Sequence, residues 1–224
     1  MGEMITLQTS DGFELGAYRA PAEGSRKGGI VLVMEIFGVT DHIKEISDRW
    51  AAEGYDVIAP QLYDREVRDY QTGYSQDELQ DAIARATACA GRFDKTAIDM
   101  QACIDALEGP VFVTGFCFGG AVSWLAACRC SGLAASAPYY GRLIINLMDE
   151  TPHCPVMCHF GEKDPTIPLE DVERLRVKHP EITIHIYEGA DHGFQSDRPD
   201  HYDEAAATLA WGRTKEFFAA NTQQ

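Results

Sequence analysis

The chain has 224 residues, 45% of them hydrophobic and 10% aromatic, and its formal net charge at pH 7 is -16. This length and composition are typical of a soluble globular protein, so we predict a single domain over residues 1–224. The negative charge repels phosphate backbones and anionic lipids, and no stretch approaches the roughly 20 apolar residues of a membrane span, so we expect neither nucleic-acid nor membrane partners.

A hairpin is predicted at the start of the chain, where two short strands, residues 3–8 and 13–19, flank the turn Ser10-Asp11-Gly12. We expect this hairpin to form one edge of a sheet. The continuous apolar run 29–34 is typical of a parallel strand that helices bury on both faces. Ser75-x-x-Glu78 resembles a capping box at the start of a helix.

Strands and helices alternate along the rest of the chain. This alternation predicts an α/β fold, a mostly parallel sheet with helices on both faces, in which functional groups collect at the carboxyl ends of the strands. The predicted helices cover about residues 41–53, 75–90, 94–108, 169–178 and 201–219, with one more after residue 117, and the predicted strands cover 55–59, 111–113, 133–139, 155–160 and 182–187.

A strand-to-helix turn is predicted at Thr114-Gly115-Phe116-Cys117-Phe118-Gly119-Gly120, directly after the apolar run Val111-Phe112-Val113. The G-x-C-x-G-G pattern is typical of a nucleophile elbow, with cysteine in place of the usual serine. Glycines at 115 and 119 fit this geometry, because a Cβ there would collide with the turning backbone. The alternative is a buried structural cysteine beside a glycine-rich helix start.

A thiol is a weak nucleophile until it loses its proton, so Cys117 needs a nearby base. Asp164 and His192 each follow a predicted strand and therefore lie at the same sheet edge as Cys117. The chain order of nucleophile, acid and histidine is that of a triad in this kind of fold, where His192 accepts the thiol proton and Asp164 orients the imidazole. Glu162 and Asp191 are the alternatives for the orienting carboxylate.

Glu35 ends a buried strand and precedes Ile36-Phe37-Gly38, so its carboxylate is embedded among apolar neighbours. Such a carboxylate is costly unless it is paired or protonated; the alternative is that it turns to water. The loop after this strand is also where an elbow fold draws one oxyanion-hole amide. We therefore expect the backbone N–H groups of Ile36 and Phe118 to form the oxyanion hole.

The seven cysteines show no evident disulfide spacing, and the N-terminus lacks a basic region followed by an apolar core, which together favour a cytoplasmic location. Cys128-x-Cys130 lies near a helix end, where both thiols can cap the core. His153-Cys154 with Cys158-His159 resembles a zinc set, but strand alternation sends Cys158 and His159 to opposite faces. We therefore expect no metal site and no cofactor.

Five segments in order along nearly the whole chain resemble the dienelactone hydrolase (carboxymethylenebutenolidase) family of α/β-hydrolases. This resemblance implies hydrolysis of an activated ester or lactone through a covalent acyl-enzyme on Cys117, with Asp164, His192 and Glu35 as partners. In such enzymes the glutamate engages the resting thiol, and the thiolate forms when substrate arrives, which protects the sulfur from oxidation. The segments are Met34-Glu35-Ile36-Phe37-Gly38, Gly115-Phe116-Cys117-Phe118-Gly119-Gly120, Tyr139-Tyr140-Gly141, Gly161-x-x-Asp164 and Ala190-x-His192-Gly193-Phe194.

The expected partner is a small-molecule ester or lactone. Family members that act on the anionic dienelactone hold its carboxylate with arginines, one of them shortly after the catalytic histidine, where this chain has Ser196. Arg198 is displaced by two residues and Arg85 lies on the upstream helix, so Arg85, Tyr140 and Arg198 are the candidate substrate-binding residues. The alternatives for function are a thioesterase with the same triad and a non-catalytic member of the fold that binds a ligand.

Overall fold

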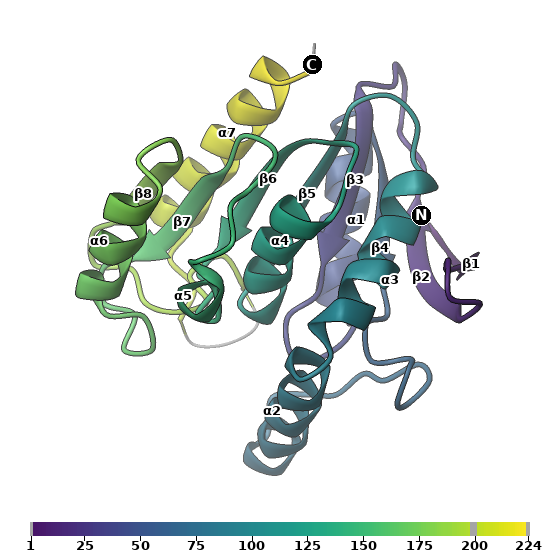
Figure 1. Cartoon of the computed structure of the whole chain (residues 1–224), viewed down its shortest axis with the longest axis horizontal. Helices are drawn as coiled ribbons and strands as arrows, with labels where there is room; N and C mark the ends of the chain where they lie inside the picture. The colour runs from purple at the N-terminus through teal and green to yellow at the C-terminus, as the bar shows by residue number, and fades with distance from the viewer. Residues whose placement is uncertain (1, 198–200, 223–224) are drawn as a thin grey trace.

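The computed structural model describes residues 2–197 and 201–222, which contain one eight-stranded sheet in the order β1-β2-β4-β3-β5-β6-β7-β8 (Figure 1). The strands are β1 (Glu3–Gln8), β2 (Glu14–Ala20), β3 (Gly28–Val33), β4 (Tyr55–Pro60), β5 (Val111–Phe116), β6 (Leu133–Tyr139), β7 (Met157–Gly161) and β8 (Thr183–Tyr187). The helices are α1 (Asp41–Ala52), α2 (Gln76–Ala90), α3 (Phe93–Asp105), α4 (Phe118–Arg129), α5 (Ile144–Leu147), α6 (Leu169–Lys178) and α7 (Glu204–Ala220).

The predicted edge hairpin and the predicted mostly parallel sheet are both confirmed. β1 pairs with β2 in antiparallel register from Glu3 opposite Arg19 to Gln8 opposite Glu14. β2 then joins the sheet antiparallel to β4, and all the pairings from β4 to β8 are parallel. β3 is buried at all six positions, as expected for a strand covered on both faces.

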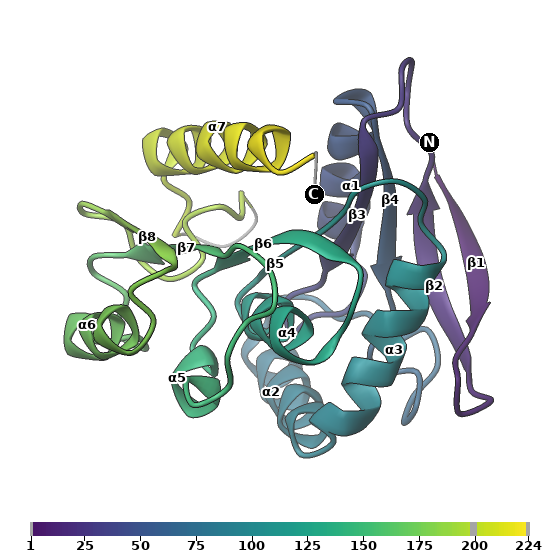
Figure 2. The ribbon, with the colours of Figure 1, turned by 45° about the horizontal axis from the view of Figure 1, so that its top comes forward.

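Helices cover both faces of the sheet. α1 and α7 lie on one face, where Trp50 and Trp211 bring the two helices together with ring centroids 4.1 Å apart. α3, α4, α5 and α6 lie on the other face, and α2 extends from the side of α3 away from the sheet (Figures 1 and 2). Within the described residues, no helix is both long enough and apolar enough to cross a membrane.

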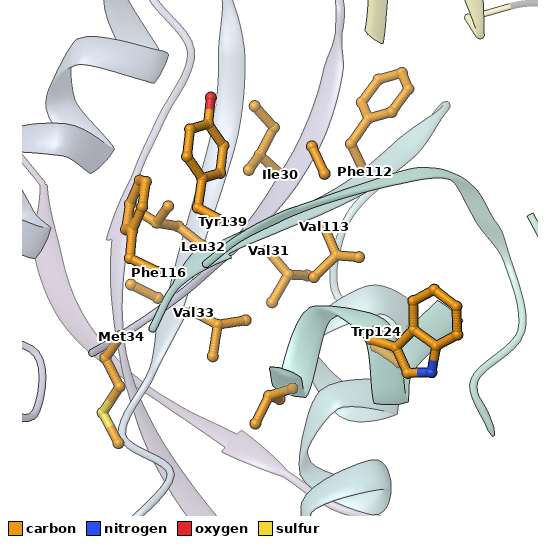
Figure 3. Close-up of a cluster of buried hydrophobic side chains, with 14 of the residues drawn as sticks. Ile30, Val31, Leu32, Val33, Met34, Phe112, Val113, Phe116, Trp124 and Tyr139 are labelled. Atoms are coloured by element: carbon orange, nitrogen blue, oxygen red, sulfur yellow. The ribbon is translucent and has the colours of Figure 1, made fainter. Parts of the chain in front are cut away.

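The core is centred on β3 and β5 (Figure 3). Their alternating side chains, including Val31 and Val113, pack against Trp124 of α4 on one face, while Phe112 stacks on Phe218 of α7 with centroids 4.5 Å apart on the other. Each of these fully buried apolar side chains stabilises the fold by about 1.5–3 kcal/mol. The predicted elbow follows directly from this core, because it begins where β5 ends.

Several element boundaries differ from the predictions by a few residues, and one short helix was not predicted. α7 begins at Glu204, because Asp203 caps it by accepting a hydrogen bond from the Ala206 N–H at 3.0 Å. β7 begins at Met157, since before it only an isolated bridge at Val156 joins the chain to β6. α5 has four residues, too few to produce a periodic pattern, and the sequence did not predict it.

Candidate active site

Cys117 occupies the sharp turn between β5 and α4. Its φ of +55° lies in the left-handed region, a strain of about 1–3 kcal/mol for a residue other than glycine. Its N–H donates to the carbonyl oxygen of Tyr139 at 3.1 Å. A Cβ on Gly115 would lie 2.6 Å from the carbonyl oxygen of Gly119, and one on Gly119 would clash with the carbonyl oxygen of Val33. The turn therefore requires the glycines that the elbow pattern supplies.

His192 is held by Asp164, with 2.7 Å between His192 Nδ1 and Asp164 Oδ2. The other oxygen of Asp164 accepts hydrogen bonds from the N–H and the hydroxyl of Thr166, at 2.8 and 2.7 Å. The two alternative carboxylates are used differently. Asp191 accepts the backbone N–H of His192 at 2.6 Å, and Glu162 accepts a backbone N–H of the β8–His192 loop. Asp164 is thus the carboxylate that orients the imidazole.

The charges of the His192–Asp164 pair follow from these bonds. Burial disfavours an imidazolium, but hydrogen bonds with Asp164 and with Cys117 outweigh burial and raise the pKa of His192 to about 10. Burial also acts to raise the pKa of the Asp164 carboxyl, yet the bonds from His192 and Thr166 leave that pKa below its usual value. Both directions favour the charged pair, in which a carboxylate lies beside an imidazolium close to Cys117.

Glu35 follows β3 and is 5% exposed, so its carboxyl does not turn to water. Burial raises the pKa of Glu35 to about 7, although the positive charge of His192 acts in the opposite direction. Among the residues that the structure describes, no hydrogen bond to this carboxyl is present. Glu35 is therefore a buried acid that can hold or release a proton near neutral pH, close to the charge on His192.

Of the two expected oxyanion-hole amides, that of Phe118 begins α4 and that of Ile36 lies in the turn after β3. Phe118 is the first residue of α4, and the first N–H groups of a helix have no acceptor within it. The carbonyl oxygen of Ile36 accepts a hydrogen bond from the Tyr63 hydroxyl at 3.2 Å, which fixes the peptide that follows Ile36. The Tyr63 ring also packs on the Phe118 ring, with centroids 6.1 Å apart, so one tyrosine contacts both expected donors.

Two residues of this site, Thr166 and Tyr63, were not predicted from the sequence. Thr166 lies two residues after Asp164, the spacing at which an aspartate commonly bonds to its own chain, so a signal for it was present. Tyr63 comes from the irregular loop after β4, and no pattern in that loop distinguishes it from the neighbouring residues.

Of the candidate substrate-binding residues, Tyr140 lies closest to the catalytic pair. Its ring contacts the His192 ring edge-on, with centroids 5.1 Å apart. Its hydroxyl is buried and has no hydrogen-bond partner, and its φ of +35° is again in the left-handed region. Ser196, which stands where the family arginine was expected, is buried, and Arg198 lies outside the described residues.

Arg85 is connected to Tyr63 through the ring of Tyr70. Its guanidinium lies over the Tyr70 ring at 5.3 Å, and Tyr70 contacts Tyr63 with ring centroids 5.5 Å apart. One terminal nitrogen of Arg85 approaches Asp81 at 3.4 Å, while the buried Nε has no partner. No group of three or more His, Cys, Asp or Glu side chains in the described ranges could hold a metal ion.

Comparisons with known proteins identify the family of this chain. The profile of the dienelactone hydrolase family matches residues 15–222. A Salmonella typhimurium protein named "Putative carboxymethylenebutenolidase" is 32% identical over 96% of this chain and 86% of its own, and a protein of that name from Synechocystis is 31% identical over 84% of each chain. The structure of a dienelactone hydrolase-like promiscuous phosphotriesterase from metagenomic libraries superposes with a TM-score of 0.82 at 21% identity, covering 99% of this chain and 98% of that one; this likeness concerns the fold.

Proposed function

This chain belongs to the dienelactone hydrolase family and is a hydrolase of ester or lactone bonds, and we propose that Cys117 is its covalent nucleophile. In this proposal the chain forms one α/β-hydrolase domain, His192 transfers the protons and Asp164 orients His192. The observation that supports it best is the position of His192. Its imidazole is 2.7 Å from the Asp164 carboxylate and lies near enough to Cys117 for that sulfur to raise the pKa of His192, while Cys117 itself sits at a turn strained by a positive φ.

The reaction has two halves. The Cys117 thiolate attacks the carbonyl carbon of the substrate, and the negative charge that develops on the carbonyl oxygen is stabilised by the N–H groups of Ile36 and Phe118. The new bond between the carbonyl carbon and the Cys117 sulfur remains, the C–O bond of the substrate breaks, and the leaving oxygen takes a proton from His192. His192 then removes a proton from water, the hydroxide attacks the thioester, and the C–S bond breaks to release the acid and the Cys117 thiolate, which takes back the proton that Glu35 accepted from the thiol at the start.

The chemistry of sulfur limits the substrates. A thiolate is a good leaving group, so the tetrahedral intermediate goes forward when the substrate also loses a good leaving group, as activated esters, lactones and thioesters do. We propose that Arg85 binds an acidic group of the substrate through its unpartnered Nε and that the Tyr140 hydroxyl contacts the reacting end. Arg198 is kept as a further candidate for substrate binding.

Glu35 is proposed to control the thiol before substrate binds. Its pKa of about 7 means that protonated and ionised forms are both populated at neutral pH. A buried carboxylate without a hydrogen bond is a strong acceptor for a thiol proton, and a substrate that enters the site changes the charge around it. Glu35 thus serves as the group that holds the Cys117 thiol in its neutral form and takes its proton on demand.

The test is Cys117→Ala against a panel of p-nitrophenyl acetate, an unsaturated lactone and a thioester. We expect turnover to disappear for every substrate, and intact-mass analysis of the unaltered enzyme during p-nitrophenyl acetate turnover to show one acetyl group on the Cys117 peptide. Cys154→Ala is the matched control, because Cys154 is also only partly buried and lies away from the site. Undiminished turnover by Cys117→Ala would refute the proposed nucleophile, and preference within the panel separates esterase from thioesterase activity.

A further inference from the structure

A fully buried histidine that the proposed reaction does not use lies in β7. The His159 side chain has no exposed surface, and both of its ring nitrogens meet hydroxyl groups. Nδ1 is 2.8 Å from the Tyr187 hydroxyl at the end of β8, and Nε2 is 3.1 Å from the Thr214 hydroxyl on α7. The Tyr139 hydroxyl at the end of β6 is 2.6 Å from the same Thr214 oxygen. Three neighbouring strands and one helix therefore meet at this imidazole.

The direction of each hydrogen bond follows from the Thr214 hydroxyl. Thr214 donates its only hydroxyl proton to the carbonyl oxygen of Ala210 at 3.0 Å, so its oxygen must accept from its other two neighbours. Tyr139 is one of these donors and His159 Nε2–H is the other. Nδ1 then carries no proton and accepts the Tyr187 hydroxyl proton. This assignment gives a neutral, Nε2-protonated imidazole and uses both acceptor positions of the Thr214 oxygen.

The surroundings keep His159 neutral. Burial lowers the pKa of His159 well below its ordinary value, and the positive charges of His185 on β8 and Arg213 on α7 act in the same direction. A protonated ring would also lose the bond from Tyr187, because Nδ1 would become a donor facing a donor. The hydrogen-bond pattern therefore stays the same across the pH range in which His192 and Glu35 change charge.

His159 and its neighbour Tyr139 are hydrogen-bonded to residues of the candidate active site. The carbonyl oxygen of His159 accepts the N–H of Tyr140 at 2.7 Å, and Tyr140 contacts the His192 ring. The carbonyl oxygen of Tyr139 accepts the N–H of Cys117. Phe194, two residues after His192, packs against the rings of the three tyrosines of this layer, with centroids 6.3 Å (Tyr139), 5.2 Å (Tyr140) and 5.0 Å (Tyr187) away.

We propose that His159 is a positioning residue for the hydrolysis reaction, because its hydrogen bonds with Tyr187 and Thr214 join the ends of β7 and β8 to α7, where the Tyr139–Thr214 bond also joins the end of β6. The carbonyl oxygen of Tyr139 accepts the N–H of Cys117 in the elbow, the Asp164 loop follows β7, and the His192 loop follows β8. A loss of the His159 bonds therefore changes the distances among all three. This inference rests on the proposed roles of Cys117, Asp164 and His192.

The test compares Thr214→Val, which keeps the shape of the side chain but removes the oxygen, with Thr214→Ser, which keeps the oxygen. We expect Thr214→Val to lower kcat about 10- to 100-fold with little change in KM, since small misplacements of reacting groups have effects of this size. We also expect it to shift the pH midpoint of Cys117 alkylation by iodoacetamide, read by peptide mass spectrometry. Thr214→Ser should restore both quantities towards those of the unaltered enzyme.

Thr96→Val is the matched control for lost stability. Thr96 is a fully buried helical threonine on α3 whose hydroxyl lies 3.4 Å from the Cys89 sulfur. Its replacement by valine should lower the melting temperature and leave the midpoint of Cys117 alkylation unchanged. If Thr214→Val does not fold, Tyr187→Phe removes the donor to Nδ1, together with the hydroxyl that Arg213 contacts, and should shift the midpoint in the same direction by a smaller amount.

Two results would overturn the positioning role. One is a folded Thr214→Val or Tyr187→Phe enzyme with unchanged kcat and alkylation midpoint, and the other is a Thr214→Ser enzyme as impaired as Thr214→Val. Neither result affects the proposed nucleophile, because that proposal fails only if Cys117→Ala remains active. The two proposals can therefore fail separately.

Discussion

Two of the regions in which the described residues bury charge differ in how that charge is matched. In the Arg65 cluster, which comprises Arg65, Asp99, Asp11 and Lys95, two cations face two anions. Arg65 donates to the fully buried Asp99 at 2.7 to 3.0 Å and to Asp11 at 3.0 and 3.1 Å, while Lys95 lies 2.8 Å from Asp11. These bonds fasten the β1–β2 turn to α3. Each polar group of the cluster therefore has its partner within the fold.

In the candidate active site, by contrast, some buried polar groups have no partner among the described residues. In the described part of the chain the Glu35 carboxyl has no hydrogen bond, and the Tyr140 hydroxyl is buried without a partner. Two of the three non-glycine residues with positive φ in the described ranges, Cys117 and Tyr140, also lie here. Buried groups that are left unmatched reduce stability, and they tend to persist where a ligand or a reaction makes use of them. The Arg65 cluster thus has its polar groups matched within the fold, whereas the candidate active site contains a buried acid and a buried hydroxyl that are not matched.

The largest expected effect is on stability, from breaking the Arg65 cluster. Arg65→Met leaves the buried Asp99 carboxylate without its cation, so we expect the free energy of unfolding in urea at pH 7 to fall by about 3–5 kcal/mol. Arg65→Met combined with Asp99→Leu should recover much of this loss, because no charge is then stranded. Hydrolase activity per folded molecule should stay unchanged. A loss below about 1 kcal/mol would show that these bonds are not what stabilises the region.

Glu35→Gln should have the opposite effect on stability. The pKa of Glu35 rises from 4.5 to about 7 on folding, so its ionisation disfavours the folded state, and this penalty grows as pH increases from 4.5 through 7. We expect the variant to be more stable than the unaltered protein by about 2–3 kcal/mol at pH 8.5, with little difference at pH 4.5. Its activity should fall. Glu3→Gln, at an exposed position, is the control. A stability difference between Glu35→Gln and the unaltered protein that does not change with pH would contradict the raised pKa of Glu35.

Tyr140→Phe has the smallest expected effect. It removes a buried hydroxyl without a partner, so we expect a gain of about 1 kcal/mol in the free energy of unfolding. Tyr18→Phe is the matched comparison, because the Tyr18 hydroxyl donates to Asp48 at 2.8 Å and accepts the Gly2 N–H. That variant should lose about 1 kcal/mol. If both variants change the melting temperature in the same direction, the difference between the two regions does not extend to single hydroxyl groups.

Much of the fold and the elbow could be predicted from the sequence, because the signals act over short distances. Apolar runs such as 29–34 identify buried parallel strands, and the glycines around Cys117 meet a steric demand of their own turn. The order of Cys117, Asp164 and His192 along the chain then assigns them to one sheet edge, since each follows a parallel strand.

Only the tertiary structure decided which groups are partners. Asp164, Glu162 and Asp191 are all acidic residues close to strand ends, and the path of the loops selects Asp164 for the His192 imidazole. The partners of His159 are 28 and 55 residues away along the chain. A hydroxyl leaves no pattern in the sequence that identifies a partner so distant, because its bond depends on where packed strands and helices bring the two atoms together. The same packing decided that Glu35 is buried without a hydrogen bond, which is the property on which its proposed role depends.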